Sequence, residues 1–223
     1  MTKAKIKIIT LLKSGPNWLP EYVYRLHRAL DRNITVPYEF ICLTDVPLGV
    51  RTLPLIPMPD VDDTNIPKFW YKIQLFRKEL DLTQGCIFLD LDTIVKGNID
   101  HYMQGLQEHD FLMATSPYRG EISCSYFMWW KGDYSWIWDK FNEKPVVEWN
   151  QHYHKANEGK YGDQGFISDH VEHDYIQHVM DSTEDIIRVT RNGSGDQARI
   201  VVFAGKRKPW DMPWHKDVQE HWL

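Results

Sequence analysis

Continuous apolar runs alternate with helical periodicity in the first hundred residues. Three runs, over 6–12, 38–45 and 86–95, are typical of strands that are buried on both faces of a sheet. Between the first two, apolar residues recur at the spacing of one helix face, which predicts a helix over 16–33 with Pro20 in its first turn. This order predicts an α/β fold whose sheet is covered on both faces.

The rest of the chain carries shorter patterns. A proline-rich stretch over 47–67 is predicted to be an ordered surface loop, and Pro67 to open a helix whose apolar face reaches Leu80. Later patterns predict a short helix after Gly97, strands over 110–115 and 122–130, a helix over 133–141, and a strand near 186–189. With no internal repeat, we expect one domain over 1–223, with a soft change in composition near residue 100.

Composition argues against several classes of protein. A formal net charge of -5 argues against a nucleic-acid binder, although a small basic pocket for an anionic substrate remains compatible with it. Cys42, Cys86 and Cys124 show no CxxC spacing, so we predict neither a disulfide framework nor a cysteine metal site, and a reducing compartment. No signal-peptide pattern and no apolar stretch of membrane-spanning length is present, so we expect a cytoplasmic protein without a transmembrane segment.

Two aspartates interrupt the third apolar run, CIFLDLDTIV. In a strand, Asp90 and Asp92 would point to the same side, with Leu91 opposite. They follow a buried strand, where open α/β sheets place their ligands, and two carboxylates suit Mg²⁺ or Mn²⁺ bridging to a diphosphate. Two alternatives stay open. One is a pair of solvated carboxylates, and the other is the D-x-D of haloacid-dehalogenase phosphatases, whose glycine is replaced here by Thr93.

Three further stretches give the chain a resemblance to a known family. FWYKIQLF precedes the aspartate pair, and GDQG and then GKRKPW follow it. In this order they resemble the GT-A glycosyltransferases, and above all glycosyltransferase family 8, which includes glycogenin and bacterial lipopolysaccharide galactosyltransferases. Glycosyltransferase-like proteins of phages and bacteria are similar as well. The resemblance covers residues 22 to 210, nearly the whole chain.

The resemblance implies a fold and an activity. The fold would be GT-A-like, that is Rossmann-like, with a mixed, mostly parallel sheet flanked by helices in a single domain. Residues 1–100 would form the donor half and 101–223 the acceptor half. The activity would be Mn²⁺- or Mg²⁺-dependent transfer of a sugar from a nucleotide-sugar donor, expected to be UDP-linked, with retention of configuration. The acceptor, a glycan, lipid, protein or small molecule, stays open.

The resemblance also implies roles for residues around the aspartate pair. Asp90 and Asp92 match the DxD that binds the metal and the donor's ribose or pyrophosphate, and Lys72 matches a basic residue that contacts donor sugar or phosphate. Asp163 and Gln164 match the pair beside the donor sugar and are the expected catalytic residues. Two alternatives remain, because Lys72 would also suit a solvated helix face and Asp163 a helix N-cap.

Two other segments match parts of the family's donor site. Gly205, Lys208, Pro209 and Trp210 match the G-x-x-K-P-W ending, in which the lysine meets the diphosphate and the glycine lets backbone approach it. The alternative for GKRK is a solvated basic turn.

The segment Thr10, Leu11 and Leu12 matches the one that cradles the nucleotide base. Thr44 and Asp45 are expected to close the second strand on the same sheet edge.

The chain departs from the family pattern in two places. Relatives carry a histidine metal ligand three residues or one residue before the glycine, where this chain has Val202 and Ala204. Two carboxylates would then hold the metal, with water and phosphate completing its shell, and His215 is a weaker candidate for the third ligand. Ser125 is retained in the sugar pocket, but Tyr126 replaces a small glycine. A catalytically weak nucleotide-sugar-binding relative is therefore an alternative, as is a metal-dependent phosphohydrolase.

The aromatic and histidine residues of the second half are candidates for an acceptor site and for a second metal site. Most of the 10 tryptophans are expected in the core, although Trp129, Trp130, Trp149 or Trp214 could line an acceptor site. His170 and His173 have helical spacing, but no cysteine or tighter histidine pair supports a second metal site.

Overall fold

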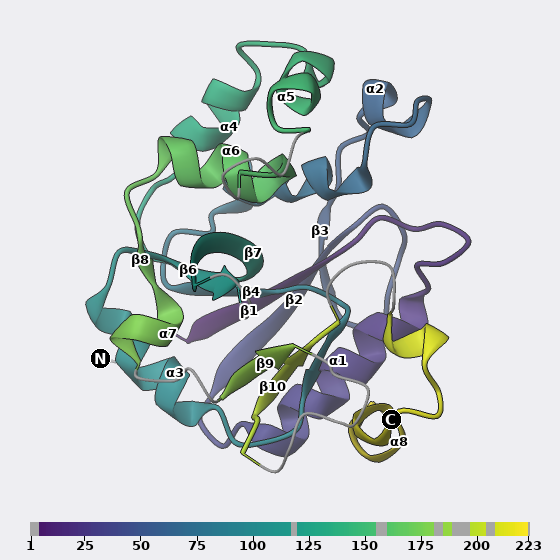
Figure 1. Ribbon diagram of the computed structural model, residues 1–223, viewed down its shortest axis with the longest axis vertical. Coiled ribbons are helices and arrows are strands. Elements are labelled where there is room, and N and C mark those ends of the chain that lie inside the picture. Colours follow the sequence, from purple (N-terminus) through teal and green to yellow (C-terminus); the bar gives the residue numbers. More distant parts are fainter. Residues whose placement is uncertain are drawn as a thin grey trace.

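A seven-stranded sheet forms the centre of the molecule (Figure 1). The computed structural model describes residues 5–116, 120–154, 160–180, 185–188, 197–203 and 208–222. The strands of this sheet, in spatial order, are β3 (Arg51–Pro54), β2 (Tyr38–Thr44), β1 (Ile6–Leu12), β4 (Cys86–Leu89), β7 (Gly120–Trp130), β6 (Phe111–Ser116) and β8 (Asp174–Tyr175). Within the sheet, β7 is antiparallel to β4 and β6, and the other pairs are parallel. The predicted mixed, mostly parallel sheet is confirmed.

Helices cover both faces of the sheet, as predicted (Figure 1). On one side lie α1 (Pro20–Asn33), α3 (Asp100–Gly105), η3 (Leu106–Glu108), α7 (Ile176–Val179) and α8 (Lys216–His221). On the other lie α2 (Pro59–Asp62), η1 (Lys68–Phe76), η2 (Lys78–Leu80), α4 (Trp136–Phe141), α5 (Val146–His152) and α6 (Gly162–His170). Among the described residues, no helix has both the length and the apolarity needed to cross a membrane.

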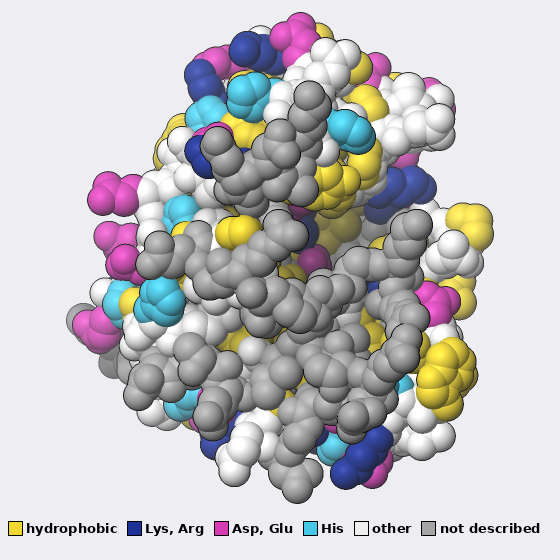
Figure 2. All heavy atoms as spheres, in the orientation of Figure 1, with side chains coloured by type: hydrophobic (Ala, Val, Ile, Leu, Met, Phe, Trp, Pro, Cys, Tyr) yellow, Lys and Arg dark blue, Asp and Glu magenta, His cyan; other side chains and the backbone are white. Residues whose placement is uncertain are grey.

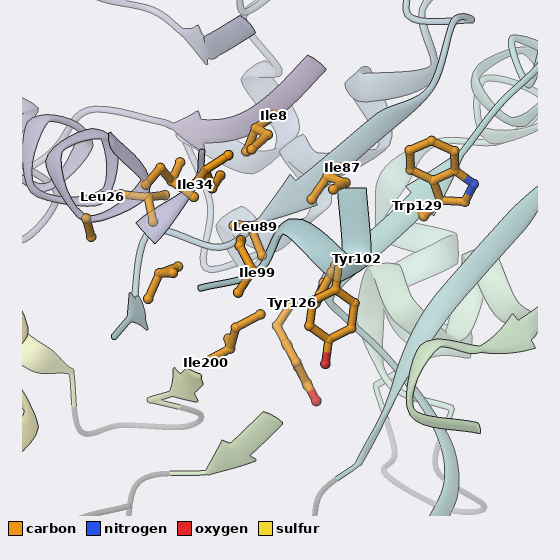
Figure 3. Close-up of a cluster of buried hydrophobic side chains, with 14 of the residues drawn as sticks. Ile8, Leu26, Ile34, Ile87, Leu89, Ile99, Tyr102, Tyr126, Trp129 and Ile200 are labelled. Atoms are coloured by element: carbon orange, nitrogen blue, oxygen red, sulfur yellow. The ribbon is translucent and has the colours of Figure 1, made fainter. Parts of the chain in front are cut away.

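Each face of the sheet packs into its own core. Successive residues of β1 point to opposite sides, so that Ile8 joins the core under α1 and Ile9 joins the core under η1 and α6. Figure 3 shows Ile8, Leu26 and Ile87 in the first of these cores. Full burial of one such side chain stabilises the fold by about 1.5–3 kcal/mol, so both faces contribute to holding the sheet that carries the site.

Two predicted helices differ from the observed ones. The first begins at Pro20 and not at residue 16, because Leu19 is extended and the Trp18 N–H donates to the Gly15 carbonyl in a preceding turn. The second is divided into the 3₁₀ helices η1 and η2. At the division Arg77 is extended, and its buried guanidinium donates to the carbonyl of Pro54 and the side chain of Gln74.

The predicted surface loop over 47–67 contains a strand and a helical turn. β3 pairs with β2 as an edge strand, a position where its terminal proline is tolerated. The strand predicted near 186–189 is β9 (Ile186–Arg188), and its last predicted residue lies outside the described ones. The cysteines are free thiols, as predicted: Cys42 and Cys86 are buried, and Cys124 is half-buried.

The run CIFLDLDTIV forms two strands in two sheets. β4 ends at Leu89, and β5 (Thr93–Val95) belongs to a three-stranded sheet with β10 (Ile200–Val202) and β9. The Thr93 N–H donates to the Asp90 carbonyl at 3.2 Å and closes a turn between them. The expectation that Asp90 and Asp92 share one strand face is therefore wrong, because both residues lie in this turn.

Candidate functional site

A cavity of about 440 Å³ opens at the carboxyl ends of β1 and β4. Five predicted site residues line it: Leu11, Lys72, Asp90, Asp92 and Lys208. Figure 2 shows a hollow in the middle of this face of the molecule, with basic and acidic side chains inside it. These predicted residues thus lie together at the carboxyl ends of the strands, where open α/β sheets place their ligands.

Lys72 is buried in η1 and meets two carboxylates. Its Nζ lies 2.9 Å from Asp90 Oδ1 and 3.4 Å from Asp163 Oδ2, and the side chain is only 8% exposed. Burial alone would lower the pKa of Lys72, but Asp163 and Asp90 outweigh it and raise that pKa. The reading of Lys72 as a solvated helix lysine is wrong, and the residue is a buried permanent cation.

Ser125 connects Lys72 to Asp163. Its hydroxyl accepts a hydrogen bond from Lys72 Nζ at 3.0 Å and donates one to Asp163 Oδ2 at 2.6 Å. β7 carries this serine past the end of β4, where the Asp90 N–H donates to the Tyr126 carbonyl. The hydroxyl of Ser125 is thus already hydrogen-bonded within the protein, and the residue is only 3% exposed.

Asp163 lies in the first turn of α6, where the N-cap is Tyr161, so the N-cap reading of Asp163 is wrong. Burial raises the pKa of Asp163, while Lys72 and Ser125 oppose that rise. Gln164 follows in the same turn and is half-buried. Gly162 precedes both with a φ of 59°, and a Cβ there would come within 2.4 Å of the Phe69 ring. The helix start therefore needs glycine to bring Asp163 to Lys72.

Asp92 is held by the C-terminal part of the chain. Lys208 Nζ donates to Asp92 Oδ2, and the Phe203 N–H donates to the Asp92 carbonyl at 3.1 Å. Burial, and then the neighbouring Asp90, raise the pKa of Asp92, while Lys208 and Lys72 lower it. The structure therefore pairs Asp92 with Lys208 across 116 positions of sequence, a contact that the resemblance did not imply.

Three other predicted site residues, Thr10, Leu12 and Trp210, are not part of the cavity lining. Thr10 is fully buried, and its hydroxyl donates to the Leu89 carbonyl at 2.8 Å, while Leu12 is in the core. Trp210 stacks on Tyr22 with ring centroids 4.2 Å apart and meets the cavity residue Trp18 edge-on. Side-chain contact with a ligand is thus open to Leu11 but closed to Thr10 and Leu12.

Gly205 and Ala204 lie outside the described residues. Val202 is a core residue of β10.

Five cavity residues were not predicted as site residues: Lys13, Trp18, Lys68, Phe69 and Leu91. Lys13 could have been found, since it directly follows a predicted strand. Its ammonium forms ion pairs with Asp45 at 2.8 Å and with Asp62 at 3.5 Å. Phe69 falls on the apolar face of the helix predicted to begin at Pro67, and periodicity alone cannot distinguish a core position from a cavity wall.

The described residues include no cluster of three or more His, Cys, Asp or Glu side chains that could hold a metal ion. His215 is buried against Phe203, and its Nδ1 lies 3.6 Å from Asp217 Oδ2. The side chains of His170 and His173 bond to the carbonyls of Phe166 and Val171 respectively. Asp90 and Asp92 are therefore the carboxylates that the described part of the chain presents to the cavity.

The candidate acceptor tryptophans separate into two kinds. Trp129, Trp130 and Trp149 are buried in the two cores, which excludes them from an acceptor site. Trp214 is 69% exposed and keeps that candidate role.

Comparison with known proteins relates the fold to solved structures. No family model and no curated protein matches the sequence. The galactosyltransferase LgtC, solved in complex with donor and acceptor sugar analogs, superposes with a TM-score of 0.60 at 12% identity, over 96% of this chain and 91% of that one. The glycosyltransferase GlyE of Streptococcus pneumoniae TIGR4 superposes with a TM-score of 0.61 at 13% identity, over 98% of this chain and 61% of that one. The chain thus has the GT-A-like fold of these proteins.

Proposed function

We propose that this protein is a metal-dependent glycosyltransferase that takes its sugar from a nucleotide-sugar donor, most simply a UDP-sugar. The observation that carries the proposal is the meeting of Asp90, Asp92, Lys72 and Lys208 on one cavity. This arrangement supplies carboxylates for a divalent cation and the Lys208 ammonium for a diphosphate, in a fold whose solved examples include glycosyltransferases.

The two aspartates suit Mg²⁺ or Mn²⁺. Both present hard oxygen ligands, and each is already matched to a positive charge, Asp90 by Lys72 and Asp92 by Lys208. Water and phosphate oxygens would complete the coordination shell, which Mg²⁺ accepts readily. When bound there, the cation would neutralise charge on the leaving nucleoside diphosphate.

Side chains of the protein would contact the diphosphate and the donor sugar and would hold the carboxylates in place. Lys208 would contact the diphosphate as negative charge develops on it, and Lys72 would hold Asp163 and Asp90 in place from its buried position. Asp163 and Gln164 would lie beside the donor sugar. Gln164 is a poor nucleophile, so we propose retention of configuration without a covalent sugar on this residue.

A thermal-shift panel of nucleotide sugars, with and without Mn²⁺, tests the proposal. A donor at a hundredfold excess over its dissociation constant should stabilise the fold by about 2.7 kcal/mol, roughly 5–11 °C for a chain of this size. We expect Asp92→Asn to lose the Mn²⁺-dependent shift. Asp139→Asn, which removes an exposed carboxylate from α4, should keep it.

Two results would contradict the proposal. One is that no nucleotide sugar gives a metal-dependent shift with the wild-type protein. The other is release of inorganic phosphate from simple phosphoesters without any nucleotide requirement, which would indicate a phosphohydrolase. Donor binding without turnover, with a range of acceptors supplied, would identify a binding relative.

A further inference from the structure

We infer that Lys208 and a divalent cation exclude each other on Asp92, so that the cation and the nucleoside diphosphate load together. The inference rests on the proposed function. It concerns how the site is filled, and it starts from the ion pair between Lys208 and Asp92 that the protein forms on its own.

The two lysines at the aspartate pair differ in how firmly they are held. Lys72 is 8% exposed, and its Nζ is within 3.4 Å of oxygens of Asp90, Asp163 and Ser125. An ammonium has three N–H donors, so these three partners use its full capacity. Withdrawing Lys72 would leave Asp163 as a buried charge without compensation, which is strongly unfavourable. Lys72 is therefore a fixed part of the site.

Lys208 is held at its backbone but much less at its side chain. Its N–H donates to Asp211 Oδ2 at 3.3 Å, and its carbonyl accepts from the Asp211 N–H at 3.0 Å. The side chain is 20% exposed and lines the cavity, and apart from Asp92 its ammonium donates to the Phe203 carbonyl at 3.3 Å. Rotation about side-chain bonds alone can move this ammonium, so it can leave Asp92 without unfolding the segment.

Asp92 needs a positive partner both before and after a cation binds. It is 5% exposed, and a buried carboxylate is costly unless it is paired. A cation bound to its Oδ2 would take the position of the Lys208 ammonium and repel it. The displaced ammonium then needs an anion within reach, and a diphosphate held by the same cation supplies one.

This exchange couples two binding equilibria. Free cation binds weakly because it must displace Lys208 into the cavity without a new partner. With a diphosphate present, the same displacement creates an ion pair. Coupling is reciprocal, so the diphosphate must tighten cation binding by the factor by which the cation tightens diphosphate binding.

The test measures Mn²⁺ binding to the full chain by electron paramagnetic resonance of free Mn²⁺, with and without UDP. For Lys208→Met we expect Mn²⁺ alone to bind about tenfold more tightly than to wild type, since a charge-assisted hydrogen bond no longer competes. We also expect UDP to improve Mn²⁺ affinity less than in wild type. Lys208→Gln serves as a second variant should Lys208→Met fold poorly.

Lys68→Met is the matched control, because it removes the same charge from the same cavity while Lys68 lies beside Gly15 and not on Asp92. Equal tightening of Mn²⁺ in both variants would mean a long-range charge effect and would overturn the inference. So would an unchanged or weaker Mn²⁺ affinity in Lys208→Met. If Lys208→Met gains Mn²⁺ affinity but no nucleoside diphosphate binds to wild type, the exclusion on Asp92 stands while the proposed function, and the coupling that depends on it, fails.

Discussion

Replacing Lys72 by methionine tests whether the buried charges of the site depend on this one cation. Methionine keeps most of the length of the side chain but has no charge and no strong donor. Asp163, 5% exposed, would then keep only the Ser125 hydroxyl of the partners that stabilise its negative charge in wild type. Asp90, which is 31% exposed, can still be solvated by water.

The magnitude follows from leaving Asp163 unpaired. Removing one partner of a buried ion pair typically destabilises a protein by about 3–5 kcal/mol. For a chain of 223 residues this corresponds to a fall in Tm of roughly 6–20 °C. We expect a loss of this size at pH 8. There the Asp163 carboxylate either stays charged without its partner or takes up a proton, and at this pH protonation also costs free energy.

The loss should depend on pH with a definite sign. Burial already raises the pKa of Asp163, and without Lys72 the main opposing influence is gone, so that pKa rises further. A carboxyl group with a raised folded-state pKa binds more protons when folded, so stability falls as the pH rises through that pKa. The deficit of Lys72→Met relative to wild type should therefore shrink as the pH falls toward the unfolded pKa of about 4.

Urea unfolding followed by tryptophan fluorescence at pH 5 and pH 8 measures both effects. Lys78→Met is the control, since it removes an exposed lysine from η2 and should change the free energy of unfolding by less than about 0.5 kcal/mol. The double variant Lys72→Met with Asp163→Asn should recover much of the loss. The reasoning is refuted if Lys72→Met costs under about 1 kcal/mol at pH 8, or if the double variant is as unstable as the single one.

Three further predictions concern the surroundings of the site. Gly162→Ala should abolish metal-dependent donor binding while the protein stays folded, because its Cβ would meet the Phe69 ring and displace the start of α6; unchanged binding isotherms would contradict this. Thr10→Val should lower the free energy of unfolding by about 1–3 kcal/mol in urea, because a buried carbonyl at the end of β4 loses its donor. The thiol of Cys42, whose pKa burial raises to about 12, should not react with a thiol reagent at pH 8 until the protein unfolds.

The sequence predicted the sheet well because its strands are buried on both faces. Continuous apolar runs such as Ile6–Leu12 are typical of such strands, and their order along the chain limits the possible sheet topologies. The division after Leu89 was missed for the same reason. Leu91 and Ile94 continue the apolar pattern, so local sequence shows no break. The second strand is separated from the first by its pairing with β10, more than a hundred residues later.

Half of the cavity lining was predicted from the sequence, but the contacts among those residues were not. Asp90, Asp92 and Lys208 were identified, and they line one cavity. Which lysine meets which aspartate could not be predicted, because burial of Lys72 depends on contacts with β7 and α6 that no local pattern encodes. Ser125 illustrates the limit, since the resemblance implied a place in the sugar pocket, while in the structure its hydroxyl donates to Asp163.

The separation of 116 residues between Asp92 and Lys208 has a consequence for biosynthesis. At typical translation rates of about 5–20 residues per second, the aspartate turn leaves the ribosome roughly 6–23 s before its partner lysine. During that interval β5 has no β10 to pair with, and Asp92 has neither its ammonium nor the Phe203 N–H. The cavity is therefore completed late, and a nascent chain can assemble most of its main sheet before the two groups that hold Asp92 have emerged.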